Sequence, residues 1–368
     1  MGQAINREYG HNISGKVIVW LTLIAILSGC AAFEAGNILG AVAGITLAHE
    51  SISAIPVVLL IGVMAAALLW SGNIQRIATL LGLIVAIMGI CFVTTALLIP
   101  HDIPSMFSEG LTPSVPPGSE LLVLGLIGTT VVPYNIFLGS GLKHAQTPQE
   151  MKTGLMIAIG LGGFISITIL LTGTAVIGEF SFPALAEALN DRLGPAGAWI
   201  LGIGLFGAGL SSTLTAALAA AVTAKSLLQK KPNEEKWLEH GIRFRSIWSG
   251  VLLIGLTFGM MELQPVPVII LAQALNGIIL PIIAVILFLL MNNDNVLPEA
   301  HQNGVLYNLI TSIVVFLTIM IGITNVVRAA SRALDFPVPD QALLFYLSAF
   351  LFLIVIIPIG KKLLKAKK

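Results

Sequence analysis

Residues 128–140 read GTTVVPYNIFLGS and lie in the middle of a long apolar run. A proline inside a helix removes one hydrogen bond, and its ring clashes with the carbonyl group four residues earlier, here that of Thr129. The β-branched residues before Pro133 weaken the helix further. Non-helical backbone at membrane depth is tolerated where protein surrounds it or where it lines a cavity, and its free carbonyl oxygens can coordinate cations. The sequence therefore predicts a helix break between about Gly128 and Asn135, with an ordinary proline kink as the alternative.

The composition places the chain in a lipid bilayer. Of its 368 residues, 56% are hydrophobic and only 10% are charged, and the mean hydropathy is +0.96. Apolar runs recur from end to end, and each is long enough to cross a hydrocarbon core of roughly 30 Å as a helix. We expect an all-α integral membrane protein of about ten spans, near residues 17–45, 54–71, 77–99, 121–142, 153–178, 196–224, 246–261, 266–291, 305–327 and 341–360.

Lysine and arginine residues predict the orientation, because cytoplasmic loops are enriched in them. With the N-terminus inside, the cytoplasmic loops hold 16 of the 19 basic residues. Both termini are therefore predicted to be cytoplasmic, in a multi-pass protein of the bacterial inner (plasma) membrane. We expect a cytoplasmic segment 1–16, a single transmembrane domain 17–360 and a basic tail 361–368. A net charge of +1 argues against a nucleic-acid partner, and the lipid bilayer is the expected surrounding.

One acidic residue, Glu34, lies well inside a span, in SGCAAFEAGNILG. Charged groups are costly in a bilayer and mark ion or proton paths there. Small neighbours such as Gly29 and Gly36 let another helix or a water-filled route come close. Glu34 is our candidate for a proton or cation path, and a carboxyl group that only cements helix packing is the alternative.

A second polar cluster lies in LAQALNGIILP, residues 271–281. Gln273 and Asn276 are three residues apart and share one helix face, and Pro281 should loosen the carbonyl of Gly277. Amide oxygens suit hard or borderline cations. Hydrogen bonding between helices is the alternative. The stretch GAGLSSTLTAALAAA from Gly207 reads first as a close-packing helix face, with hydroxyls that line a pathway as the alternative.

Several catalytic patterns are missing from the sequence. It contains no nucleotide-binding P-loop, no H-E-x-x-H and no G-x-S-x-G, and its six histidines fall in loops or near span ends. We therefore expect no enzyme activity and no cofactor.

Four stretches together resemble the Nramp family of divalent metal transporters. GTTVVPYN with IFLGS is similar to the family's sixth helix around M-P-H-N. GLFGAGLSSTLTAALAAA and AQALNGIILPIIAVILFLLMNN resemble its eighth and tenth helices, and GQAINREYG resembles the connection before its third helix. The resemblance implies a LeuT-type fold of inverted repeats. It also implies that residue 17 begins the third family helix, so that the chain is N-terminally incomplete and lacks the first two.

The resemblance implies a metal site as well. The sixth-helix carbonyl ligand falls on Thr129, and Gln273 matches the tenth-helix glutamine that helps close around the ion. Asn135, two residues after Pro133, is a third candidate ligand. Val132 stands where the family has its coordinating methionine and offers no thioether, which puts a preference for soft metals in doubt.

The family's proton path is only partly matched. Glu34 corresponds to the family glutamate, but Ala31 replaces an aspartate, and Tyr134 and Gly139 replace two histidines. These departures weaken the expectation of proton coupling.

Taken together, these features predict a secondary transporter that moves a divalent cation of the Mn, Fe or Mg class by alternating access, with proton symport left open. The alternatives are a carrier of the same fold for a non-metal solute and an inactive, N-terminally truncated fragment. The sequence predicts no particular oligomeric state.

Overall fold

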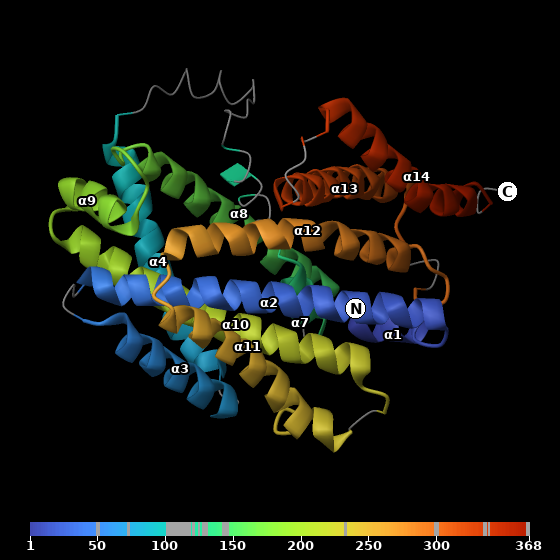
Figure 1. Ribbon diagram of the computed structural model, residues 1–368, viewed down its shortest axis with the longest axis horizontal. Helices are drawn as coiled ribbons and strands as arrows, with labels where there is room; N and C mark the ends of the chain where they lie inside the picture. The colour runs from blue at the N-terminus through green and yellow to red at the C-terminus, as the bar shows by residue number, and fades with distance from the viewer. Residues whose placement is uncertain are drawn as a thin grey trace.

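Figure 1 shows the computed structural model, a bundle of long helices. It describes residues 1–48, 52–71, 74–100, 132–141, 147–231, 234–297, 302–333 and 339–365, with the single residues 119, 122, 123, 126 and 337. Within these residues there are helices and no strand. The predicted all-α fold class is therefore confirmed.

The long helices follow the apolar runs of the sequence. The helices are α1 (Gly2–Tyr9), α2 (Ile13–Ala48), α3 (Ala54–Ser71), α4 (Ile74–Leu98), α7 (Pro133–Gly141), α8 (Pro148–Gly173), α9 (Phe182–Leu193), α10 (Ala196–Leu228), the short η1 (Glu235–Trp237), α11 (Ile242–Met260), α12 (Pro265–Met291), α13 (Val305–Ala333) and α14 (Gln341–Lys365). The ends of α3 coincide with the predicted span, and most other long helices begin or end a few residues outside the predicted limits, whereas α8 ends at Gly173 and not at the predicted 178.

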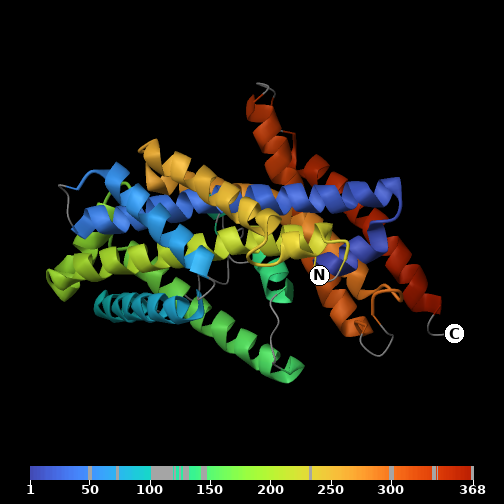
Figure 2. The same ribbon diagram turned by 90° about the horizontal axis from the view of Figure 1, so that it is seen from below.

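Helix α2 lies at the centre of the bundle and packs against α10, α11 and α12 (Figures 1 and 2). The contact with α10 is made by small residues. A Cβ atom placed on Gly209 would lie 2.6 Å from the carbonyl oxygen of Asn37 and 2.7 Å from the backbone nitrogen of Ala41. Gly44 likewise faces the carbonyl oxygen of Gly202. The backbones of α2 and α10 therefore touch directly, without a layer of side chains between them.

Helix α9 lies between the predicted spans 153–178 and 196–224, where the apolar pattern predicts no helix. The Ser181 hydroxyl caps it by accepting a hydrogen bond from the backbone N–H of Ala184 at 3.2 Å. Leu185 and Leu189 are buried in a cluster with residues of α4 and α10. This short helix is thus anchored across one end of the bundle.

A buried pair of asparagines links the end of α12 to α13. Asn292 donates to the side-chain oxygen of Asn308 at 3.0 Å, and Asn308 donates back at 2.8 Å. Asn292 also donates to the carbonyl of Phe288, and Asn308 to that of Asn303. The two amides thus satisfy each other where water is largely excluded.

Asn308→Leu should destabilise the protein by about 1–3 kcal/mol, because the buried Asn292 amide would lose both hydrogen bonds that it exchanges with Asn308. Replacing both asparagines by leucine should cost less than the single change, since no amide then faces an apolar side chain in place of the other amide. Thermal unfolding of the purified protein in detergent measures both. A double variant less stable than Asn308→Leu would contradict this account.

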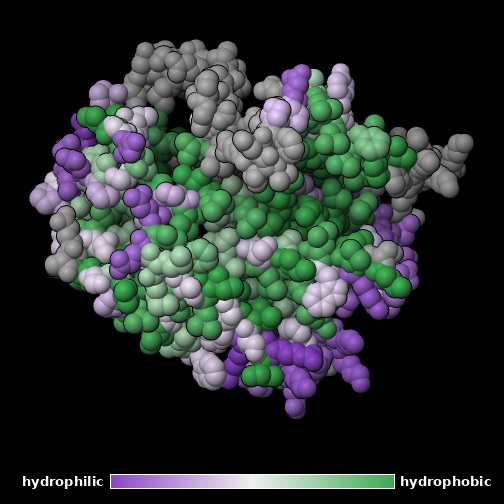
Figure 3. All heavy atoms as spheres, in the orientation of Figure 1, coloured by the Kyte–Doolittle hydropathy of each residue, from purple (hydrophilic) through white to green (hydrophobic). Residues whose placement is uncertain are grey.

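The face of the bundle seen in Figure 3 is largely apolar, and many large hydrophobic side chains of the long helices are exposed. Six helices in the described part of the chain are long and apolar enough to cross a membrane: residues 15–47, 54–71, 149–173, 196–228, 265–291 and 305–324. The apolar stretches of α4 and α14 are shorter, residues 82–98 and 342–357. Helix α11 begins with Arg243 and Arg245, and α7 has nine residues. These four helices overlap the other predicted spans.

Candidate functional site

A cavity of about 190 Å³ lies between α2, α10 and α12, with the first residue of α9 at its border. We call it the inner cavity. Three polar side chains line it, Asn37 of α2, Ser212 of α10 and Gln273 of α12. Ser212 stands halfway along α10, so the cavity lies deep within the apolar part of the bundle.

Small residues open this space. Gly36, Gly40 and Gly209 line the inner cavity together with Ala208 and Ala272. A Cβ atom placed on Gly40 would meet no atom within 4 Å, because it would point into open space. The same abundance of small residues that brings α2 and α10 together thus leaves room beside their contact.

Gln273 lines the inner cavity, whereas its predicted companion Asn276 does not. Asn276 is buried, and its side-chain oxygen lies close to Gly29 of α2. Helix α12 continues through Pro281, whose ring packs against Gly322 of α13. The two amides therefore have different surroundings although they share a helix face.

Asn37 was not predicted as a site residue from the sequence, and Ser212 was covered only by the alternative interpretation of the hydroxyls in the stretch from Gly207. The side-chain nitrogen of Asn37 is buried and forms no hydrogen bond within the described residues. No hydrogen bond from this nitrogen therefore fixes the orientation of the amide in the described part of the chain. The available signal was weak: Asn37 follows Glu34 by one helical turn, and Ser212 lies in the run GAGLSSTL.

Glu34 is fully buried on α2, and neither of its carboxyl oxygens has a hydrogen-bond partner in the described part of the chain. Its side chain packs against α11, where a Cβ atom on Gly255 would lie 2.5 Å from the Glu34 Cγ. An unpartnered buried carboxyl group is costly, so such a group is conspicuous in a packed bundle. Glu34 does not line the inner cavity.

Helix α7 begins at Pro133, and Val132 lies outside any helix. Proline suits the first position of a helix, where its missing N–H would have no partner. The backbone N–H of Asn135 donates to the Val132 carbonyl at 3.1 Å, but the Asn135 side chain is exposed and does not line the inner cavity. Thr129 lies outside the described residues. The structure therefore groups Gln273 with Asn37 and Ser212 rather than with Asn135.

Tyr134, Gly139 and Ala31 stand at the positions where the family that the sequence resembles has ionisable groups. Tyr134 is buried, and its ring meets that of Phe33 edge to face, with centroids 5.6 Å apart. A Cβ atom placed on Gly139 would meet no atom within 4 Å. Ala31, on α2, is only partly buried.

No group of three or more His, Cys, Asp or Glu side chains that could hold a metal ion occurs within the part of the chain that the structure describes. The inner cavity instead offers two amide groups and a hydroxyl. Neutral oxygen ligands of this kind suit hard cations, which exchange them for water ligands.

The same arrangement of helices occurs in solved structures. A mutant of the manganese transporter of Eremococcus coleocola matches with a TM-score of 0.61 at 17% identity, over 97% of this chain and 80% of that one. The same transporter in complex with an aromatic bis-isothiourea substituted compound matches with a TM-score of 0.60 at 15% identity, over the same shares. The predicted LeuT-type transporter fold is thus confirmed.

Relatives are also found by sequence. The natural resistance-associated macrophage protein 2 homolog of Dictyostelium discoideum is 25% identical over 89% of this chain and 53% of its own length. The divalent metal cation transporter MntH of Burkholderia ambifaria is 22% identical over 58% of this chain and 53% of its own length. The chain thus spans about half the length of these relatives. Residues 1–328 match the model of the natural resistance-associated macrophage protein-like family, and the chain therefore belongs to the Nramp family.

Proposed function

We propose that the protein is a secondary transporter that moves divalent metal cations across a membrane by alternating access. The inner cavity carries this proposal, because it places Asn37, Ser212 and Gln273 together inside an apolar bundle. Secondary transporters of this kind bind their substrate near the midplane of the bilayer. Membership of a family whose relatives include divalent metal cation transporters supports the same conclusion.

The ligands favour a hard cation. Amide and hydroxyl oxygens suit Mg²⁺ and Mn²⁺ better than softer metals, which prefer sulfur or imidazole. Val132 supplies no sulfur at the position of the family methionine. We propose Mn²⁺ or Mg²⁺ as the substrate, with Fe²⁺ as the softer competitor. The Thr129 carbonyl, on the basis of the resemblance, and the Asn135 amide stay proposed as further ligands.

The proposal includes the orientation of the protein in the membrane. Lys225, Arg243 and Arg245 lie where α10 ends and α11 begins, near the basic loop between these helices. We place this end of the bundle and both termini in the cytoplasm of a bacterium, with the protein in the inner membrane. The link from α8 to α10, which contains α9, then lies on the outer side.

Gln273→Ala should lower the uptake of Mn²⁺ about tenfold, the equivalent of ~1.4 kcal/mol of cation binding. The change removes an oxygen ligand and leaves the helix intact, since alanine is a good helix former. Radioactive Mn²⁺ uptake by cells that express matched amounts of protein measures it, with Mg²⁺, Fe²⁺ and Ca²⁺ as competitors.

Gln149→Ala serves as the matched control, because Gln149 is an exposed residue near the start of α8 and should leave uptake unchanged. If Gln273→Ala and Gln149→Ala transported Mn²⁺ equally, Gln273 would not be a ligand. A protein with no saturable uptake of any of the four cations would overturn the proposed function.

A further inference from the structure

A second cavity, of about 520 Å³, lies where α2 ends and where α9 and α12 begin. We call it the outer cavity. Its polar lining includes the Glu179 carboxyl group and the hydroxyls of Thr46 and Ser181, and no lysine or arginine is among the described residues that line it. This lining favours cations over anions.

The inner and outer cavities share walls from the same two helices. Along α2 the lining passes from Asn37 in the inner cavity to Thr46 in the outer one. Along α12 it passes from Gln273 back toward Pro265 at the helix start. The two cavities are therefore successive sections along one side of α2 and α12.

Phe182 is the residue at the boundary. Among the described residues it alone lines both cavities. It is the first residue of α9 and is partly buried. The Phe182 residue therefore borders both cavities.

The structure holds the backbone of Phe182 firmly in place. Ser181 caps the helix that Phe182 begins, and Leu185 and Leu189 anchor that helix against α4 and α10. At its other end, the Asn190 side chain accepts a hydrogen bond from the Ala198 N–H of α10 at 2.8 Å. With the backbone fixed, rotation of the Phe182 side chain is the simplest way to widen the boundary, and such rotamer changes are fast.

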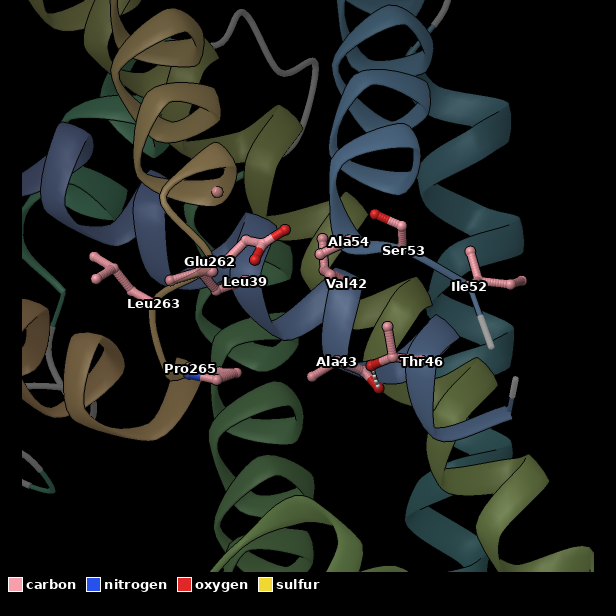
Figure 4. A pocket seen from close by; sticks show the side chains of 11 residues that line it. Leu39, Val42, Ala43, Thr46, Ile52, Ser53, Ala54, Glu262, Leu263 and Pro265 are labelled. Atoms are coloured by element: carbon pink, nitrogen blue, oxygen red, sulfur yellow. Dashed lines mark hydrogen bonds between the residues drawn. The ribbon is translucent and has the colours of Figure 1, made fainter. Parts of the chain in front are cut away.

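A third cavity, of about 400 Å³, adjoins the outer cavity across the end of α2 and shares Ala43, Thr46 and Pro265 with it (Figure 4). Glu262, from the link between α11 and α12, and Ser53, before α3, also line it. Oxygen-bearing side chains thus line both cavities at the end of α2.

We propose that Phe182 is an aromatic gate, and that a cation passes from the outer cavity to Asn37, Ser212 and Gln273 only when its ring turns aside. The assignment of the passing solute as a cation rests on the proposed function, whereas the gate itself does not. A phenyl ring offers no ligand to a hydrated ion, so it blocks the passage while it stands between the cavities.

The test measures access rather than transport. Cys30 and Cys91 are replaced by alanine, and Ser212→Cys places a reporter thiol in the inner cavity. A membrane-impermeant, cationic methanethiosulfonate reagent is then applied to the outside of intact cells. Phe182→Ala should raise the labelling rate of the reporter about tenfold, because this rate follows the fraction of time that the passage is open. Phe182→Trp should lower it.

Phe180→Ala is the matched control. Phe180 lies edge to face with Phe182, at 6.4 Å between ring centroids, and it lines the outer cavity only. Its removal should leave the labelling of the Ser212→Cys reporter unchanged. A second reporter, Thr46→Cys in the outer cavity, should react at the same rate whether residue 182 is phenylalanine or alanine.

Three results would overturn the gate: no effect of Phe182→Ala, an equal effect of Phe180→Ala, or labelling of the inner reporter from the cytoplasmic side alone. Size-exclusion profiles of the variants show that each is folded. If labelling depends on Phe182 while no divalent cation is taken up, the gate stands and the proposed function falls. If the cations are taken up and labelling ignores Phe182, the substrate enters elsewhere.

Discussion

Gly209→Leu should push α2 and α10 apart and destabilise the protein by at least about 3 kcal/mol. Even a single Cβ atom at this position would lie 2.6 Å from the carbonyl oxygen of Asn37 and 2.7 Å from the backbone nitrogen of Ala41. A flexible side chain could rotate away from such a contact, but helix backbone cannot, so the two helices must separate along their length. Gly209→Ala should show the same effect at about 1–3 kcal/mol. Thermal unfolding of the purified protein, followed by size-exclusion chromatography, measures both.

Gly40→Ala is the control on the other helix of this pair. A Cβ atom there has no neighbour within 4 Å, and alanine is favoured over glycine inside a helix by about 0.5–1 kcal/mol. The two alanine variants should therefore shift the unfolding temperature in opposite directions. If Gly209→Ala were as stable as Gly40→Ala, the direct contact of the two backbones would be wrong.

Glu34→Gln should remove most of the pH dependence of Mn²⁺ uptake, because an amide cannot take up or release a proton. Glu34 is fully buried and its carboxyl group has no partner within the described residues, so it has the isolation expected of a proton-carrying group in a membrane. Among the described residues, the titratable groups of Cys30 and Tyr134, both buried, also lie close to Glu34. Uptake at mildly acidic and neutral pH, at matched expression, measures the effect.

Glu187→Gln provides the comparison, since Glu187 is exposed on α9 and should leave the pH profile as it is. A Glu34→Gln variant with an unaltered profile would assign Glu34 to the packing of α2 against Gly255. Uptake lost at every pH, with a normal size-exclusion profile, would instead point to a role in binding the cation.

The long helices could be predicted from the sequence because a bilayer demands continuous apolar runs, and such runs have clear ends. The bounds of α3 are an example: polar residues precede Ala54 and follow Ser71. Helix α9 was missed because it is short and amphipathic, so a search for spans does not register it. Its local signals were nevertheless present, with Ser181 as the cap and Pro183 in the first turn.

The site was less predictable than the fold. Gln273 could be named because a polar residue in an apolar span is rare, but Asn37 and Ser212 join it only through the packing of three helices. Asn135, by contrast, lies in the short helix α7. The exposure of its side chain depends on how that helix packs and not on the neighbouring residues in the sequence. Phe182 could not be recognised at all from the sequence, since its importance comes from standing between two cavities.

The direct contact between α2 and α10 restricts how the protein can change shape. Helices that are separated by side chains can slide, because side chains repack in small steps. Here Gly44 meets the Gly202 carbonyl and Gly209 meets backbone atoms of α2, so any sliding would drive one backbone into the other. These two helices should move together as one rigid body throughout a transport cycle. The movement that exposes the inner cavity to alternate sides must then come from elements on its other walls, α12 first among them.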